Sequence, residues 1–148
     1  MRTTEEIKIK KLMINDFEAL TDLWNRAGLP FRQKGRDSKG NLELQILRNP
    51  QFFLGAFHSK KLIGSAILSC DLRKGWINRL AVDPNFKRTE VAKQLISKSE
   101  NVLGECGVSI FCALIEEDNL ASRELFKDCH YVEHHDIVYY SKRTSSDV

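Results

Sequence analysis

One stretch of the chain restricts its possible folds more than any other. "GWINRLAV", residues 75–82, is an apolar run of strand length, and "VSIFCALI", residues 108–115, is another. Between them, from about Thr89 to Leu103, apolar side chains recur at the spacing of an amphipathic helix. A strand, a helix and a strand in this order place the two strands parallel, with a right-handed crossover. The stretch therefore predicts an α/β (α+β) fold, in which helices cover a mixed sheet.

The remaining segments supply the other elements of this sheet. "EIKIKKL" alternates like a first strand, "QFFLGAFH" and "KLIGSAILSC" form a hairpin, and "HYVE" and "DIVYYSK" close the chain as strands. Helices are expected after Asn15, in "NLELQILRN", and in "DNLASRELFKDC", where Asp118 or Asn119 is the N-cap. Gly64, inside the hairpin, indicates a bulge or a close backbone approach. We expect a mixed, mostly antiparallel central sheet of about seven strands with four helices, the fourth and fifth strands being parallel.

Length and charge limit the class of protein. The 148 residues suit a single domain over residues 1–148, with residues 142–148 as a frayed tail. The net charge of +3, without a basic patch, argues against a nucleic-acid partner. No apolar run reaches membrane-spanning length and the first residues lack the core of a signal peptide, so no membrane association is expected.

The cysteines give a further indication of location. Cys70, Cys106, Cys112 and Cys129 form no Cys-x-x-Cys pair, which favours buried thiols over metal ligands. No metal is predicted, and the default location is the reducing cytoplasm. Monomer and homodimer both stay open.

The junction after the 75–82 run raises the functional question. In "VDPNFKRTEVAKQL" a turn at Asp83 is followed by Lys87 and Arg88 and then by a helix, whose first amides can hold an anion. Glu90 places a carboxylate where that anion would lie. The segment is either a phosphate site or an ordinary solvated helix start.

Two segments resemble the GNAT family of N-acetyltransferases. In that family a strand ending Leu-Ala-Val-x-Pro precedes (Gln/Arg)-x-x-Gly-x-(Gly/Ala), which opens a helix. Here Leu80, Ala81 and Val82 match the strand, Lys87 stands for Gln/Arg, Glu90 replaces Gly, and Ala92 matches the final small residue.

The second segment, "NLASRELFKDCHY", resembles the family's Asn-x-x-Ala-x-x-Leu-Tyr-x-x-x-Gly-Phe. Asn119 and Leu125 match it, and Ser122 is close to Ala. The three departures are Phe126 for Tyr, His130 for Gly and Tyr131 for Phe.

The resemblance implies the acyl-CoA N-acyltransferase (GNAT) fold and acetyl transfer from acetyl-CoA, as co-substrate, to an unidentified primary amine. The amine belongs to a small molecule or a protein, and it attacks the thioester directly. The resemblance assigns cofactor binding to Leu80, Ala81, Val82, Lys87, Arg88, Thr89, Glu90, Val91, Ala92, Asn119, Ser122 and Phe126.

The residues for proton transfer are harder to assign, because Phe126 occupies the position of the family's usual tyrosine acid. Glu116 is a candidate base, with a solvated strand-end charge as its alternative, and Tyr131 is a candidate acid, with a core aromatic as its alternative. Water can also protonate the leaving thiolate, because a thiol has a pKa of about 8.5.

Two further questions stay open. The loop "FRQKGRDSKG" carries Arg32, Lys34, Arg36 and Lys39, which either attract an acidic acceptor or are simply solvated. Glu90 and Phe126 also favour an alternative function, a degenerate GNAT-fold binding or regulatory module with weak or no acetyl transfer.

Overall fold

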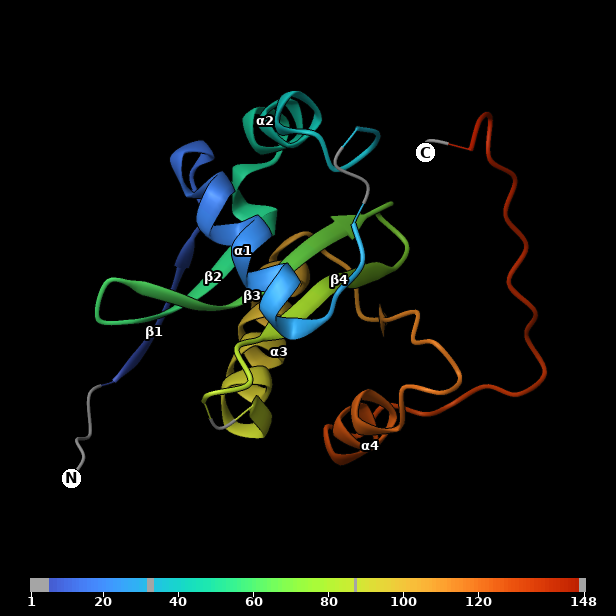
Figure 1. Ribbon diagram of the computed structural model, residues 1–148. Helices are drawn as coiled ribbons and strands as arrows, with labels where there is room; N and C mark the ends of the chain where they lie inside the picture. The colour runs from blue at the N-terminus through green and yellow to red at the C-terminus, as the bar shows by residue number, and fades with distance from the viewer. Residues whose placement is uncertain (1–5, 32–33, 87, 147–148) are drawn as a thin grey trace.

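A five-stranded sheet forms the centre of the molecule (Figure 1). The computed structural model describes residues 6–31, 34–86 and 88–146. Along the sheet β1 to β4 pair antiparallel in sequence order, and β5 joins β4 in parallel, which confirms the predicted parallel pair. The strands are β1 (Ile7–Lys11), β2 (Phe53–His58), β3 (Lys61–Cys70), β4 (Gly75–Val82) and β5 (Phe111–Cys112).

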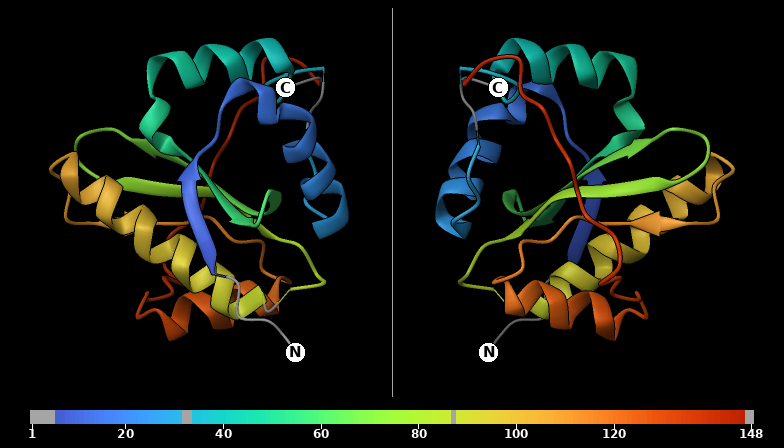
Figure 2. Two further views of the ribbon diagram at one scale, coloured as in Figure 1. Left: turned by 90° about the vertical axis from the view of Figure 1, so that its left-hand side faces the viewer. Right: turned by 90° about the vertical axis from the view of Figure 1, so that its right-hand side faces the viewer.

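Within the described residues, four α-helices pack around this sheet. Two of them, α1 (Phe17–Ala27) and α2 (Lys39–Arg48), lie on one face, and α3 (Arg88–Glu105) crosses the other (Figure 2). The fourth, α4 (Leu120–Asp128), lies beyond α3, and the short 3-10 helices are Ile14–Asp16 and Pro50–Phe52. No helix within the described ranges has the length and apolar character needed to cross a membrane.

The prediction of about seven strands was wrong. The run 108–115 pairs only at Phe111–Cys112, and the expected strands at 130–133 and 136–142 do not form. An extended run becomes a strand only where another strand edge lies within hydrogen-bonding reach. Beyond α4 the chain instead runs along the outside of the molecule, away from the sheet (Figure 1).

The helix between the parallel strands agrees closely with its prediction. It begins one residue before Thr89 and ends two residues after Leu103. Its expected apolar stripe is buried in full: Val91, Ala92, Leu95, Ile96, Val102 and Leu103. The four cysteines, by contrast, are free and only partly buried.

Gly64 explains how closely α3 approaches the sheet. A Cβ at this position would lie 3.0 Å from Leu95 Cδ1 and 3.2 Å from Val91 Cγ1. The ladder with β2 also shifts register beside it. Both readings of Gly64 are confirmed, and the absent side chain lets the first turns of α3 rest on β3.

Candidate functional site

The parallel strands β4 and β5 separate soon after they meet. They pair at Gly75 with Phe111 and at Trp76 with Cys112, and the Gly75 N–H donates to the Ile110 carbonyl at 2.9 Å. Beyond Trp76, β4 continues to Val82 with no strand partner on that side among the described residues. The backbone of residues 77–82 therefore presents an open edge whose N–H and C=O groups can pair with a ligand.

Because β4 and β5 are parallel, both point toward the same end of the sheet, and α3 begins at that end shortly after β4. In the first turn of α3 the amides of Arg88, Thr89 and Glu90 have no carbonyl partner within the helix. They lie at the positive end of the helix dipole. Lys87, the predicted cation before them, lies outside the described residues. The open edge of β4 thus leads directly to a set of amides suited to an anion.

Asp83 fixes the turn between β4 and α3. Its side chain is fully buried, accepts the Asn85 N–H at 2.9 Å and the Arg26 Nε–H at 3.1 Å, and lies 3.7 Å from Lys61 Nζ. Desolvation acts to raise the pKa of Asp83, but the bond from Asn85 and the charges of Arg26 and Lys61 outweigh it and lower that pKa. The carboxylate therefore stays ionised and holds the start of α3 in place.

Glu90 does not cover the amides of its own helix. The side chain is exposed and makes no hydrogen bond or ion pair with any residue that the structure describes. Val91 and Ala92, the next two residues, are buried against the sheet and so fix the orientation of this turn of the helix. Glu90 would therefore repel a bound anion through its charge, but its side chain does not fill the place of the anion.

A β-bulge interrupts β4 midway along its open edge. Ser65 pairs with Ala81 and Ile67 pairs with Asn78, so that Ala66 faces both Arg79 and Leu80. Arg79 has a φ of +54°, a left-handed conformation that is uncommon for residues other than glycine. The Ser65 hydroxyl donates to the Arg79 carbonyl at 2.8 Å and accepts the indole N–H of Trp24 at 3.1 Å.

The side chain of Arg79 ties the bulge to the connection between α1 and α2. Its guanidinium donates to the Asp37 carboxylate and to the Pro30 carbonyl, and lies 5.1 Å from the Trp24 ring centre. Sequence reasoning missed this contact. The signal was present, since an arginine within an apolar strand needs a polar partner.

The predicted basic loop lies in the same connection. Lys34, Arg36 and Lys39 are exposed, whereas Arg32 lies outside the described residues. The loop therefore presents cations to solvent while Asp37, in the same turn, is buried against β4.

Asn119 is the N-cap of α4, seven residues after the end of β5. Its Oδ1 accepts the Ser122 N–H at 3.1 Å, which confirms one of the two predicted caps. Its Nδ2 has no hydrogen-bond partner among the residues described, and can donate to a ligand. Phe126, two turns further along α4, is buried with its ring 4.9 Å from that of Tyr131, edge to face.

The two predicted proton-transfer residues lie at opposite ends of α4. Glu116 is exposed in the turn before the helix, and its carbonyl accepts the Asn119 N–H at 3.0 Å. Tyr131 follows the helix, whose nine residues span roughly 13 Å. Its hydroxyl donates to Glu100 at 2.7 Å, and burial, this bond and the Glu100 charge together raise the pKa of Tyr131. The structure does not bring these two residues together.

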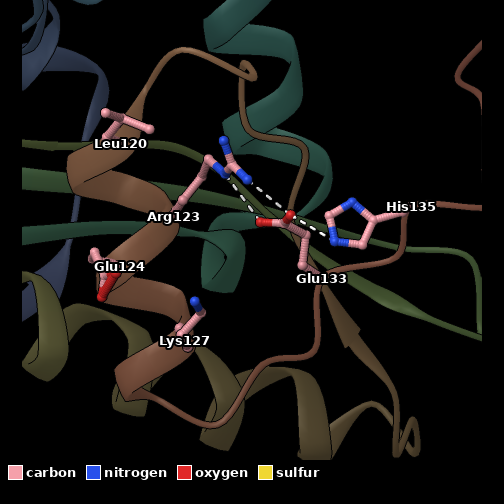
Figure 3. A pocket seen from close by; sticks show the side chains of 6 residues that line it. All are labelled: Leu120, Arg123, Glu124, Lys127, Glu133 and His135. Carbon is pink, nitrogen blue, oxygen red and sulfur yellow. Dashed lines mark hydrogen bonds and ion pairs between the residues drawn. The ribbon is translucent and has the colours of Figure 1, made fainter.

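A pocket of about 420 Å³ lies elsewhere on α4, on the face that carries Arg123 (Figure 3). Arg123 donates twice to the Glu133 carboxylate, at 3.0 and 2.9 Å, and His135 Nε2 lies 3.0 Å from the same group. The charges of Arg123 and Glu133 satisfy one another, and none of the predicted site residues lines the pocket. The lining residues are Leu120, Arg123, Glu124, Lys127, Glu133 and His135.

Comparison with known proteins identifies this arrangement. The chain is 28% identical to an acetyltransferase of Pectobacterium atrosepticum over 95% of its own length and 98% of the relative's. An acetyltransferase of Photorhabdus laumondii matches at the same identity and the same coverage. Both relatives align with nearly the whole chain.

Solved structures share the fold at lower identity. PaiA N-acetyltransferase from Thermoplasma acidophilum, in complex with coenzyme A, has a TM-score of 0.74 at 23% identity, covering 84% of this chain and 88% of that one. Aminoglycoside N-acetyltransferase AAC(6')-Iy, in complex with CoA, has a TM-score of 0.75 at 18% identity, covering 97% and 99%. A model of the Acetyltransferase (GNAT) family matches residues 17–131, which include the β4–α3 junction and the whole of α4. The chain therefore belongs to the GNAT family of acetyltransferases.

Proposed function

We propose that this protein is an N-acetyltransferase that moves the acetyl group of acetyl-CoA to a primary amine. Family membership supplies the acetyltransferase class. One observation carries the proposal further: the open edge of β4 runs directly into the free amides of α3. In acetyl-CoA the thioester is carried on a long arm that contains amides and ends in a pyrophosphate. The amides of the arm match the donors and acceptors of β4, and the pyrophosphate matches the amides of α3.

In this proposal the pyrophosphate lies on the amides of Arg88, Thr89 and Glu90, with Lys87 adding charge. The pantetheine arm pairs with the backbone of β4 between Leu80 and Val82, and Asn119 Nδ2 donates from the opposite side. Proteins with the same fold have been solved in complex with coenzyme A, which supports coenzyme A as the ligand. The remaining predicted contacts serve as walls of the site: Ala81, Val91, Ala92, Ser122 and Phe126.

The chemical step needs few side chains. The neutral amine attacks the thioester carbon, and the carbonyl oxygen becomes an oxyanion that accepts a hydrogen bond from a backbone N–H at the bulge, proposed as Leu80. Collapse of this intermediate breaks the carbon–sulfur bond and releases CoA thiolate, while the nitrogen loses its proton through water to Glu116. The proton of Tyr131 is directed at Glu100, so we propose that solvent protonates the thiolate.

The acceptor side of the site is proposed to be the connection between α1 and α2. Arg79 holds this connection against the bulge, and this contact supports the proposal that the cations of the connection lie near the thioester. Exposed Lys34 and Arg36 favour an amine that carries a carboxylate and disfavour a polycation. One structural neighbour is an aminoglycoside N-acetyltransferase, and charge argues against such a cationic acceptor here.

The test follows release of free CoA thiol when the full-length protein meets acetyl-CoA and a panel of amines. We expect carboxylate-bearing amines to be acetylated in preference to polycationic ones, with the product identified by mass spectrometry. Transfer to polycations alone would contradict the proposed acceptor class, and the absence of transfer to every amine would contradict the enzyme.

A binding or regulatory module is the second candidate, because Phe126 offers no hydroxyl and Glu90 adds a negative charge. Calorimetric titration separates the two. Acetyl-CoA binding without thiol release over the whole panel favours the module, whereas binding with thiol release favours the enzyme.

A further inference from the structure

Two cysteines lie together at the end of α3 that is remote from the candidate site. Cys70 is the last residue of β3, and Cys106 directly follows the last residue of α3. Both are free and partly buried, so small molecules in solvent can reach their sulfur atoms. The 18 residues of α3 span roughly 27 Å and separate this pair from the amides at the start of the helix.

The backbone brings the two side chains to one place. Cys70 pairs with Gly75 of β4, and directly opposite residues of an antiparallel pair direct their side chains to the same face of the sheet. A Cβ at Gly75 would lie 2.8 Å from Leu103 Cδ1, so this face is the one that the last turn of α3 covers. The Leu103 carbonyl accepts the Cys106 N–H at 2.9 Å. Cys106 is therefore held in the turn of the chain that rests over the end of β3.

The two thiols interact with each other. Partial burial, the charge of Cys70 and a hydrogen bond between the two thiols raise the pKa of Cys106. Cys70 Sγ also accepts the Leu72 N–H at 3.3 Å, and the exposed cations Arg73 and Lys74 follow in the same turn. A partly exposed sulfur that accepts an N–H beside cations is suited to react as a nucleophile. A second thiol within hydrogen-bonding reach is suited to resolve the product of that reaction.

We infer that Cys70 and Cys106 form a reversible disulfide when the protein meets a low-molecular-weight disulfide such as oxidised glutathione. The Cys70 thiolate attacks one sulfur of the oxidant, and the first glutathione leaves as its thiolate. The Cys106 thiol then loses its proton to solvent, and its sulfur attacks Cys70 Sγ and displaces the second glutathione. Two protein thiols are thereby oxidised to one disulfide, while the disulfide of the oxidant is reduced to two thiols.

This disulfide fastens the end of β3 to the end of α3 and closes a loop that contains β4 and the whole of α3. A cross-link of this kind stabilises a fold mainly by restricting the unfolded chain, and a long loop gives the larger effect. The open edge of β4 and the first amides of α3 take no part in it. The inference therefore goes beyond acetyl transfer and does not depend on it.

Peptide mapping of the full-length protein is the first test. The protein is treated with oxidised glutathione, its remaining thiols are alkylated, and its peptides are identified by mass spectrometry. We expect a Cys70–Cys106 linkage that an excess of reduced glutathione removes. Cys112→Ser and Cys129→Ser are matched controls at the other partly buried thiols and are expected to leave the linkage unchanged. Absence of this linkage, whether the two cysteines stay free, carry glutathione or join other partners, would overturn the inference.

Single variants test the order of the two steps. In Cys106→Ser the second step is blocked, so we expect a glutathione adduct to accumulate at Cys70. In Cys70→Ser we expect the adduct at Cys106 to form about tenfold more slowly, because the raised pKa of Cys106 leaves less thiolate. Faster reaction at Cys106 than at Cys70 would contradict the assignment of Cys70 as the nucleophile.

Thermal unfolding measures the effect of the bond on the fold. We expect the oxidised wild type to unfold about 5–10 °C above the reduced wild type. Cys70→Ser, treated in the same way, is expected to show no such rise. An equal rise in Cys70→Ser, or no rise in a wild type whose linkage has been mapped, would contradict a bond that joins β3 to α3 in the native fold.

Discussion

The carboxylate of Glu90 lies in the first turn of α3, at the end of the helix where the proposed pyrophosphate binds. It is exposed, so its repulsion of a phosphate is close to the value in water, about 1 kcal/mol for unit charges about 4 Å apart. Glu90→Gln is therefore expected to tighten acetyl-CoA binding about fivefold. Calorimetry at low and high salt measures the effect, which should shrink as salt rises.

Glu105→Gln, at the far end of the same helix, is the matched control for that prediction and should leave the affinity unchanged. Weaker binding by Glu90→Gln would mean that the carboxylate assists the cofactor, contrary to the proposed placement.

Tyr131 is expected to stabilise the protein rather than to act on substrate. Tyr131→Phe removes a hydrogen bond to the Glu100 carboxylate and should lower the free energy of unfolding by about 1–2 kcal/mol. The rate of acetyl transfer should stay within about threefold of the wild-type rate, because in this proposal solvent, and not Tyr131, protonates the thiolate. Urea unfolding and thiol-release kinetics on the same sample measure both quantities. A rate loss of about a hundredfold with unchanged stability would instead assign Tyr131 as the acid.

At the scale of elements, the turn from β4 into α3 depends on a buried charge. Asp83→Asn keeps an oxygen for the Asn85 N–H but loses the charge that pairs with Arg26. The pKa of Asp83 is lowered in the folded protein, so the stability from its ionisation is present above the ordinary value of 3.8 and is lost as the pH falls below it. The variant should therefore be less stable than wild type near pH 7, and the difference should shrink below about pH 4.

Urea unfolding from pH 7 down to pH 3 measures this difference. Asp71→Asn offers a comparison at an exposed turn, where Asp71 accepts backbone N–H groups but forms no ion pair in the part of the chain described. A difference for Asp83→Asn that stays constant with pH would contradict the role of its charge.

The bulge of β4 depends in the same way on Arg79. Arg79→Met removes one charged hydrogen-bond partner of buried Asp37 and is expected to lower the free energy of unfolding by about 1.5–3 kcal/mol. Arg48→Met, at the exposed end of α2, is the control and should change stability by less than about 0.5 kcal/mol. Equal effects of the two variants would show that the Arg79–Asp37 pair does not support the bulge.

The elements that sequence predicts well are those with local causes. The stripe of α3, the cap at Asn119 and the parallel pair follow from spacings within a few residues or from a single crossover. The bulge at Arg79 and its pairing with Asp37 join segments 42 residues apart, and no local pattern specifies such a partner. The prediction of two C-terminal strands was wrong for the same reason. "DIVYYSK" has the composition of a strand, but its pairing depends on which strand edge it reaches.

At the scale of the whole molecule, the candidate site depends on the separation of β4 from β5. The family resemblance placed its residues on β4, α3 and α4; in the structure β4 leads directly into α3, and α4 begins eight residues after β5, the parallel partner of β4. Glu116 and Tyr131, the proton-transfer residues proposed from sequence, lie at opposite ends of α4. Such roles rest on distances across the fold, which spacing along the chain does not fix.

The central claim is that backbone groups of β4 and α3 hold acetyl-CoA. Hydrogen exchange of the full-length protein, with and without saturating acetyl-CoA, tests it most directly, because exchange reports on the amides themselves. We predict slower exchange between residues 80 and 90 on binding, and unchanged exchange in α2. Saturated binding that leaves exchange between residues 80 and 90 as in the free protein would contradict the account.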